Sequence, residues 1–301
     1  CPDSRPPRTL LCYHENTARV FFNSDPDRNP GRYFGIELEV DGVNRSESFS
    51  TVLCKTLDIL DKDENDKDLN HWTAMRDGSL RNSGMELISQ PMTSSFFDTA
   101  GCIDRLSKAM RYLISVGYRS HDTDTCGLHF HVSRDALSVE QMVNMDVLCD
   151  RFWDVVVKLS RREEEGLHWC KKSDANNKTE DELRRLCDPG EAYERYQILN
   201  FTNRDTVELR IFRGTLKINS FLAAMHFFRF IIEFSDALTF RQAKRITQEK
   251  FLSAMGSYSS ELKTYMIERN VIPPENTEPD PILLAWRDYR EAIEAQHKTA
   301  A

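Results

Sequence analysis

The amino-acid sequence predicts an α+β fold, in which helices cover one face of an antiparallel sheet. Several short segments alternate apolar and charged residues, the pattern of a strand with one buried face. Two pairs of these segments are separated by turn-forming residues, as in β-hairpins. Longer segments, which alternate irregularly with the strands, carry apolar residues at helical spacing.

The composition is that of an ordinary globular protein. The chain has 301 residues, of which 40% are hydrophobic and 29% charged, enough for one large domain or two. A net charge of −8 argues against a broad nucleic-acid surface. The longest apolar stretch, residues 221–234, is too short for a membrane span and contains His226, Arg229 and Glu233. Eight cysteines stand singly, so we expect reduced thiols, a cytoplasmic protein and no membrane anchor.

The chain is expected to have three parts. Residues 1–31 contain five prolines and should form an irregular arm over the body. Residues 32–270 should form the main domain. Residues 271–301 combine a proline-rich linker with a final helix near 282–296.

Within the main domain, the patterns predict the elements individually. Strands are expected at 33–40, 71–75, 85–89, 126–133, 195–201 and 206–212. Helices are expected at 48–60, 95–116, 138–160, 219–235, 240–255 and 258–269, with a short one after Thr179. Gly117 should end the second helix, and Ser138 with Gln141 should form a capping box for the third. The polar segments 61–71 and 161–181 are expected to be loops, the second a lid or substrate loop.

Four of these strands carry charged residues opposite their apolar face. In the first, Glu37 and Glu39 share one face, with their Cα atoms about 7 Å apart. The same alternation places further groups on the opposite face of the other strands: Glu86, His129, His131, Glu208 and Arg210. One such strand would usually mean an exposed sheet face. Repetition with these residue types instead favours a site across one face of the sheet.

The residue types indicate a metal and phosphate site. Carboxylate oxygens favour Mg²⁺ or Mn²⁺, and an imidazole among them is more compatible with Mn²⁺. Two such ions can bridge nucleotide phosphates, and an arginine stabilises the charge of a transferring phosphoryl group. The sequence has neither a GxxxxGK[ST] nor a GxGxxG motif, so a P-loop or Rossmann nucleotide site is not expected.

Four segments, in order, resemble the amidoligase family of phages, bacteria and fungi, which are carboxylate–amine ligases with the glutamine synthetase fold. They are FGIELEV at 34–40, DGSLRNSGMELISQP at 77–91, CGLHFHVS at 126–133 and NFTNRDTVELRIFRGTL at 200–216. The resemblance covers about residues 33–235. It implies a bent antiparallel sheet with helices on its convex face, whose concave face holds ATP and two or three Mg²⁺ or Mn²⁺ ions.

The resemblance also implies roles for individual residues. The metal ligands would be Glu37, Glu39, Glu86, His129 and Glu208, with His129 also serving the nucleotide phosphates. His131 would lie on the substrate or phosphate side, and Arg210 would contact the transferred phosphate. Arg213 matches the next basic position and is expected to be catalytic, although strict alternation would point it to the wrong face unless the strand ends or bulges near Phe212. Tyr196 and Asn200 match positions expected to bind the nucleotide, and Asp77 matches a position with a less defined role. Arg161 and Arg162 are placed to reach a substrate or nucleotide.

The activity implied is an ATP-dependent ligase that joins a carboxylate to an amine through an acyl phosphate. One of the two substrates could be a peptide or a protein. No counterpart of the ammonia site of glutamine synthetase is found, so glutamine synthesis is not expected. Three alternatives stay open: a metal-dependent hydrolase using His129 and His131, a guanidine kinase, and a non-catalytic nucleotide-binding module.

Overall fold

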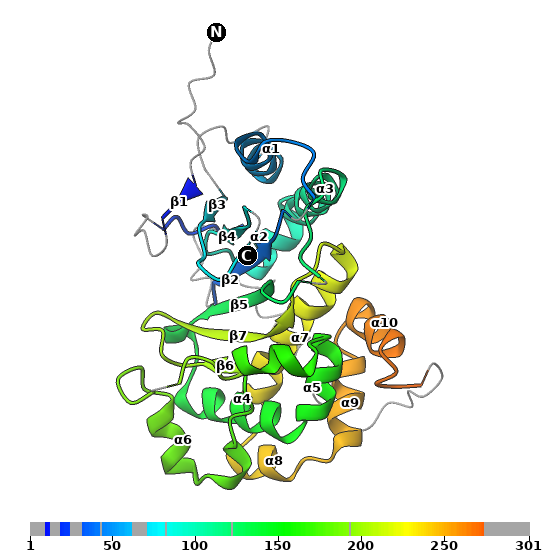
Figure 1. Ribbon diagram of the computed structural model, residues 1–301. Coiled ribbons are helices and arrows are strands. Elements are labelled where there is room, and N and C mark those ends of the chain that lie inside the picture. Colours follow the sequence, from blue (N-terminus) through cyan, green and yellow to red (C-terminus); the bar gives the residue numbers. More distant parts are fainter. Residues whose placement is uncertain are drawn as a thin grey trace.

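The computed structural model describes residues 10–12, 19–24, 32–42, 44–61, 71–81, 83–121, 123–192 and 194–273. Within them, one seven-stranded sheet is covered by helices, which confirms the α+β class (Figure 1). The strand order is β1-β3-β4-β2-β5-β7-β6. The strands are β1 (Leu10–Leu11), β2 (Phe34–Val40), β3 (Trp72–Met75), β4 (Met85–Ser89), β5 (Gly127–Ser133), β6 (Leu199–Asn200) and β7 (Thr206–Arg213).

The sheet is antiparallel except at one edge, where β1 runs parallel to β3. The expectation of a wholly antiparallel sheet is therefore wrong at this edge. Within the predicted arm, Leu10–Leu11 form this edge strand, in which Leu10 pairs with Ala74. The arm is tied down a second time at Phe22, which is buried and forms a bridge with Met92. Leu10–Leu11 thus cover the edge of β3, and Phe22 covers part of the core beside Met92.

The helices are α1 (Phe49–Asp61), α2 (Ser94–Thr99), α3 (Cys102–Ser115), α4 (Val139–Arg151), α5 (Trp153–Ser160), α6 (Glu180–Leu186), α7 (Ile218–Asp236), α8 (Phe240–Arg245), α9 (Gln248–Gly256) and α10 (Ser260–Glu268). Three predicted helices are each divided in two. The first breaks at Gly101, whose φ of 70° is easily adopted by glycine. The second breaks at Phe152, and the third before Thr247, which caps α9. Gly117 has the left-handed backbone expected beyond α3, with a φ of 89°.

Two other local predictions are corrected by tertiary contacts. Ser138 caps α4 by accepting a hydrogen bond from Gln141 N, but the Gln141 side chain donates to Ile232 O instead of closing a capping box. The strand predicted at 195–201 is only two residues long in β6. Its first half pairs with Lys171 instead, since Ile198 N donates to Lys171 O. The segment 161–181 contains two 3-10 turns, Glu164–Trp169 and Ala175–Asn177, rather than loop alone.

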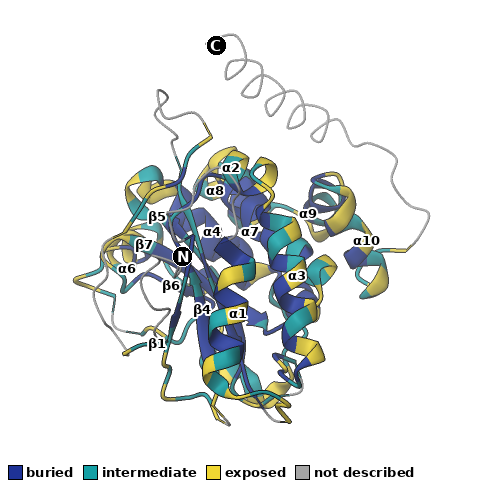
Figure 2. Ribbon diagram, turned by 90° about the horizontal axis from the view of Figure 1, so that it is seen from above, coloured by how far each residue is buried: buried dark blue, intermediate teal, exposed yellow. Residues whose placement is uncertain are grey.

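The main core lies between the sheet and α7. Phe130 of β5 packs against Phe221 and Phe228 of α7, and Phe228 also meets Phe34 at the start of β2. Figure 2 shows α4 and α7 as largely buried helices, whereas α1 and α3 have exposed outer faces. The apolar stretch 221–234 is therefore a buried helix, as predicted. Among the described residues, none of the helices is both long and apolar enough for a membrane crossing.

Some predictions concern parts of the chain outside the described residues. These are most of the arm, the charged loop at 62–70 and the C-terminal segment from 274 onward, including the helix expected near 282–296. The division of the chain into three parts stays a prediction.

Candidate metal centre

The sheet register brings the charged residues of four strands together on the face opposite α7. Glu39 of β2 stands across from Glu86 of β4. On the other side of β2, Glu37 stands across from His129 of β5. His131 then stands across from Glu208 of β7. Directly opposed residues share a face of the sheet, so the predicted alternation holds in all four strands.

These residues form three groups, each with ligand atoms within 4.8 Å of one another. The groups are Glu39, Asp77 and Glu86; then Glu37, Glu86 and His129; then Glu37, His131 and Glu208. Neighbouring groups share a carboxylate, first Glu86 and then Glu37. They therefore follow one another across β4, β2, β5 and β7. Carboxylates with a single imidazole are a donor set that suits Mg²⁺ or Mn²⁺.

Asp77 was predicted without a defined role. Its Oδ1 accepts a hydrogen bond from Ser79 N at 2.6 Å, the usual role of an aspartate that begins a turn. It also belongs to the first ligand group. The ligand role depends on the pairing of β4 with β2, which brings the β3–β4 turn and Asp77 close to Glu39.

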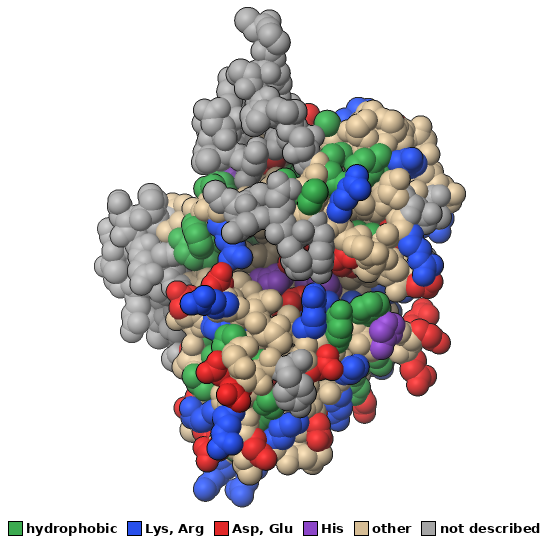
Figure 3. All heavy atoms as spheres, turned by 60° about the vertical axis from the view of Figure 1, so that its left-hand side comes forward, with side chains coloured by type: hydrophobic (Ala, Val, Ile, Leu, Met, Phe, Trp, Pro, Cys, Tyr) green, Lys and Arg blue, Asp and Glu red, His purple; other side chains and the backbone are tan. Residues whose placement is uncertain are grey.

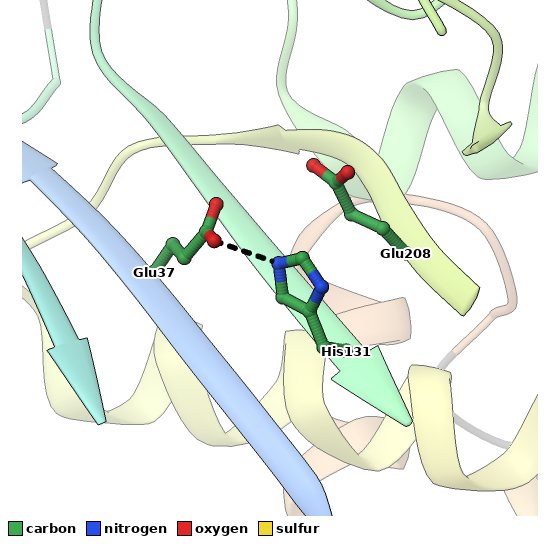
Figure 4. A group of neighbouring side chains, drawn as sticks. All are labelled: Glu37, His131 and Glu208. Carbon is green, nitrogen blue, oxygen red and sulfur yellow. Dashed lines mark ion pairs between the residues drawn. The ribbon is translucent and has the colours of Figure 1, made fainter. Parts of the chain in front are cut away.

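Glu37 contacts both histidines of the cluster, and Figure 4 shows its carboxylate beside the ring of His131. Its Oε1 lies 3.0 Å from His131 Nε2 and its Oε2 lies 3.3 Å from His129 Nδ1. His129 Nδ1 is also 3.5 Å from Glu208 Oε1. The ion pair between Glu37 and His131 does not have the geometry of a hydrogen bond. His131 Nε2 is therefore a buried nitrogen without a hydrogen-bond partner. It remains available as a metal ligand, while His131 Nδ1 lies 3.2 Å from Thr206 Oγ1.

The carboxylates of the cluster fall into two electrostatic classes. Burial opposes ionisation of Glu37, but the nearby His131 and His129 outweigh it and hold the pKa of Glu37 well below its usual range. In Glu208, His131 and Arg210 likewise outweigh burial and lower the pKa. Burial raises the pKa of Glu39.

Glu86 shows the strongest effect of the opposite sign. Burial, reinforced by Glu37, Glu39 and Asp77, raises the pKa of Glu86 well above its usual range. So many carboxylates in one buried place repel one another unless positive charge is supplied. A divalent cation would supply it.

Glu208 is held at the β7 end by several donors. Asn200 Nδ2 and Asn203 Nδ2 donate to its Oε2, at 2.8 and 3.2 Å. Arg210 Nη1 donates to its Oε1, and Arg210 Nε lies 3.5 Å from Trp169 O. The ring of Tyr196 is 5.8 Å from the Arg210 guanidinium. Tyr196 and Asn200 therefore support Arg210 and Glu208; Asn203 and Thr206, also in this shell, were not predicted.

A β-bulge lies where the prediction for Arg213 required one. Leu128 pairs with Phe212 but Phe130 pairs with Leu209, so two residues of β7 oppose one of β5. The bulge turns Phe212 into the core, where it meets Phe130, and returns Arg213 to the face of Gly127. Arg213 nevertheless lies outside the residues that line the cleft, 4.0 Å from Glu163.

Arg162 and Gly127 hold the bulge against the cluster. Arg162 donates from Nε to Ile211 O at 3.1 Å, and its Nη2 is near Phe212 O at 3.3 Å. Gly127 N donates to Glu39 Oε2. A Cβ at position 127 would lie 2.7 Å from His129 Nε2 and 2.9 Å from Arg162 Nη2, so a larger residue would displace these two side chains. The Arg162 side chain contacts the backbone of β7, and its reach to a ligand stays a prediction.

The cluster lies in a cleft of about 1370 Å³. Figure 3 shows a hollow in this side of the molecule with histidine side chains at its floor. Besides the ligand groups, the cleft is lined by arginines, among them Arg19, Arg195 and Arg204, and by Phe21 and Tyr33. An acidic floor and a basic wall would suit a ligand that carries both metal-bound and directly bound anionic groups.

Comparison with known proteins found neither a protein-family model that matches the chain nor a curated protein similar to it in sequence. The site must therefore be interpreted from its own geometry.

Proposed function

We propose that this protein is an ATP- and Mg²⁺- or Mn²⁺-dependent carboxylate–amine ligase, with a sheet of the glutamine synthetase type and the site motifs of the amidoligase family. The observation that carries the proposal is the row of three ligand groups that share Glu86 and Glu37, with Arg210 at the end formed by Glu208. A mononuclear hydrolytic site needs about three ligands and one open position. A row of shared carboxylates is better matched to a polyphosphate.

The chain's own residues would position ATP and the acid substrate. Divalent ions, when bound, would neutralise the phosphate oxygens. Arg210 would hold the transferred phosphoryl group, and Asn200 and Asn203 would fix Glu208 beside it. His131, whose ring is oriented by Thr206, would lie on the phosphate or substrate side.

The reaction would have two steps. A carboxylate oxygen attacks the γ-phosphorus, the bond to ADP breaks, and an acyl phosphate forms. The amine nitrogen then attacks the acyl carbon, gives up a proton, and displaces inorganic phosphate to leave an amide. Phosphorylation converts a poor leaving group into a good one, so the protein mainly has to place the reactants and balance charge. The acid and the amine would be small molecules or a peptide. Other residues of the cleft would determine which substrates bind.

Metal and nucleotide binding provide the first test. Calorimetry should show Mn²⁺ binding and metal-dependent binding of a non-hydrolysable ATP analogue. Glu37→Gln should weaken both at least tenfold while the protein stays folded, because Glu37 belongs to two ligand groups. Glu249→Gln, on an exposed part of α9, is the matched control. Equal binding by Glu37→Gln and the parent would contradict the assignment of the site.

Turnover separates the proposed ligase from its alternatives. A screen of carboxylates and amines should find ADP release that requires both an acid and an amine. Metal-dependent cleavage without nucleotide would indicate a hydrolase, and a stable phosphorylated guanidine would indicate a kinase. Nucleotide binding without turnover on any pair would favour a binding module.

A further inference from the structure

A second cavity, of about 580 Å³, lies among the helices, apart from the metal cluster. It is formed by α3, the end of α5, the start of α7 and α10. Figure 1 shows α3 and α10 on the right-hand side of the molecule. None of the residues that line it also lines the cleft of the candidate metal centre.

The charged side chains that line this cavity are mostly cationic. They are Arg111, Arg161, Lys217 and Arg269, with Glu268 as the single acidic residue among its lining residues. The whole chain has a net charge of −8, so a cavity lined by four cations differs in sign from the chain as a whole. Together they give the cavity a positive potential that would concentrate anions.

Three of the four cations are held by neutral partners. Arg111 Nη1 donates to Ser107 Oγ at 2.7 Å, and Arg269 Nε is 3.3 Å from Lys158 O. Arg161, whose backbone is left-handed with a φ of 61°, lies beside Tyr265 and is one of the cations that lower its pKa against the effect of burial. Within the described part of the chain, none of the four forms an ion pair with a carboxylate. Guanidinium groups held by neutral partners keep their charge available for a ligand.

Part of the cavity wall is apolar. Met110, Leu216 and Tyr265 are buried residues that line it. The first turn of α7, a 19-residue helix, also borders the cavity and adds backbone N–H groups and the positive end of its dipole. A ligand with an anionic group and an apolar or aromatic body would match both parts of the wall.

We propose that this cavity is a binding site for a small phosphate-bearing molecule with an apolar or aromatic body. The phosphate would lie among Arg161, Arg269 and Lys217, and the body against Met110, Leu216 and Tyr265. The site is independent of the metal centre and of the function proposed for it.

Phenyl phosphate and inorganic phosphate are suitable probes. Calorimetry is carried out in excess EDTA, because the acidic metal centre without metal ions repels phosphate. Phenyl phosphate should bind saturably with one site per chain, and more tightly than inorganic phosphate. The double variant Arg161→Met/Arg269→Met should weaken this binding at least tenfold, since each arginine contributes a charge-assisted hydrogen bond.

Three matched variants define the outcome. Arg241→Met, at an exposed position of α8, should bind phenyl phosphate like the parent. Lys217→Met should weaken binding without threatening the fold, because Lys217 is exposed. Glu37→Gln, which disables the metal centre, should leave it unchanged. The absence of saturable binding, or binding unaffected by the Arg161→Met/Arg269→Met and Lys217→Met changes, would overturn the proposal.

Discussion

The two faces of the same sheet have opposite energetics. Facing α7, residues such as Phe130 and Leu209 are buried among other apolar side chains, each contributing about 1.5–3 kcal/mol to stability. Facing the cleft, Glu39, Glu86 and Glu208 are nearly as buried but carry ionisable groups. Burying such groups opposes folding unless they are paired, protonated or bound to metal.

The difference between the faces separates folding from function along each strand. In β2, β4, β5 and β7, the apolar face toward α7 stabilises the fold. The charged face toward the cleft is held in place by that fold. Changes on the helix-covered face should therefore alter the free energy of unfolding. Changes on the cleft face should alter metal binding with little loss of stability.

The largest effect is expected in the core. Phe228→Ala should destabilise the protein by about 3–5 kcal/mol, because Phe228 is fully buried between Phe34 and Phe130. Urea unfolding would measure the loss. Ile114→Ala, at a side chain that is 49% exposed, should change stability by no more than about 0.5 kcal/mol. Similar losses in both variants would show that the face against α7 is not the main core.

A second prediction concerns a buried carboxylate on the helix-covered side of the sheet, where most buried side chains are apolar. Burial raises the pKa of Asp146 on α4 from 3.8 to about 6. The folded state therefore favours the protonated form. The resulting stabilisation is complete below pH 3.8 and is lost as the pH rises through about 6, by up to about 3 kcal/mol.

Asp146→Asn should abolish this dependence. Relative to the parent, the variant should become more stable as the pH rises from 4 to 7, as measured by urea unfolding at each pH. Asp154→Asn, at an exposed position of the neighbouring helix, is the control. A stability difference that does not change with pH would contradict the raised pKa.

The third prediction concerns Glu86 on the cleft face. Because its pKa is raised well above the usual range, glutamine resembles the protonated side chain of the metal-free protein. Glu86→Gln should leave the free energy of unfolding within about 1 kcal/mol of the parent in EDTA. It should lower Mn²⁺ affinity at least tenfold, about 1.4 kcal/mol, because Glu86 belongs to two ligand groups. A large loss of stability without metal would mean that Glu86 is structural.

The smallest effect is expected for Asn203→Ala. This change removes one of two amide donors to Glu208 Oε2 and leaves Asn200 in place. The cost should be about 1 kcal/mol, or about fivefold in Mn²⁺ affinity. Asn177→Ala, which loses a surface hydrogen bond to Asp174, should leave metal affinity unchanged. A loss larger than that of Glu86→Gln would place Asn203 among the ligands.

Local patterns predicted most elements but not their breaks. Alternation located β2, β4, β5 and β7, and helical spacing located α1 and α7, because both periodicities record which side faces the core. The missing capping box at Ser138 and the shortening of β6 depend on contacts with distant residues, Gln141 with Ile232 and Ile198 with Lys171. Such contacts leave no signal in a single sequence.

The sequence by itself determined which side chains share a face: Glu37 and Glu39, His129 and His131, Glu208 and Arg210. A strand's side chains alternate whatever it pairs with. Only the tertiary structure decided that Glu86 stands opposite Glu39, that Asp77 joins them, and that a bulge held by Arg162 resets the facing of Arg213. Register, hairpin closure and bulges depend on pairing between segments distant in the chain, so they are properties of the folded sheet.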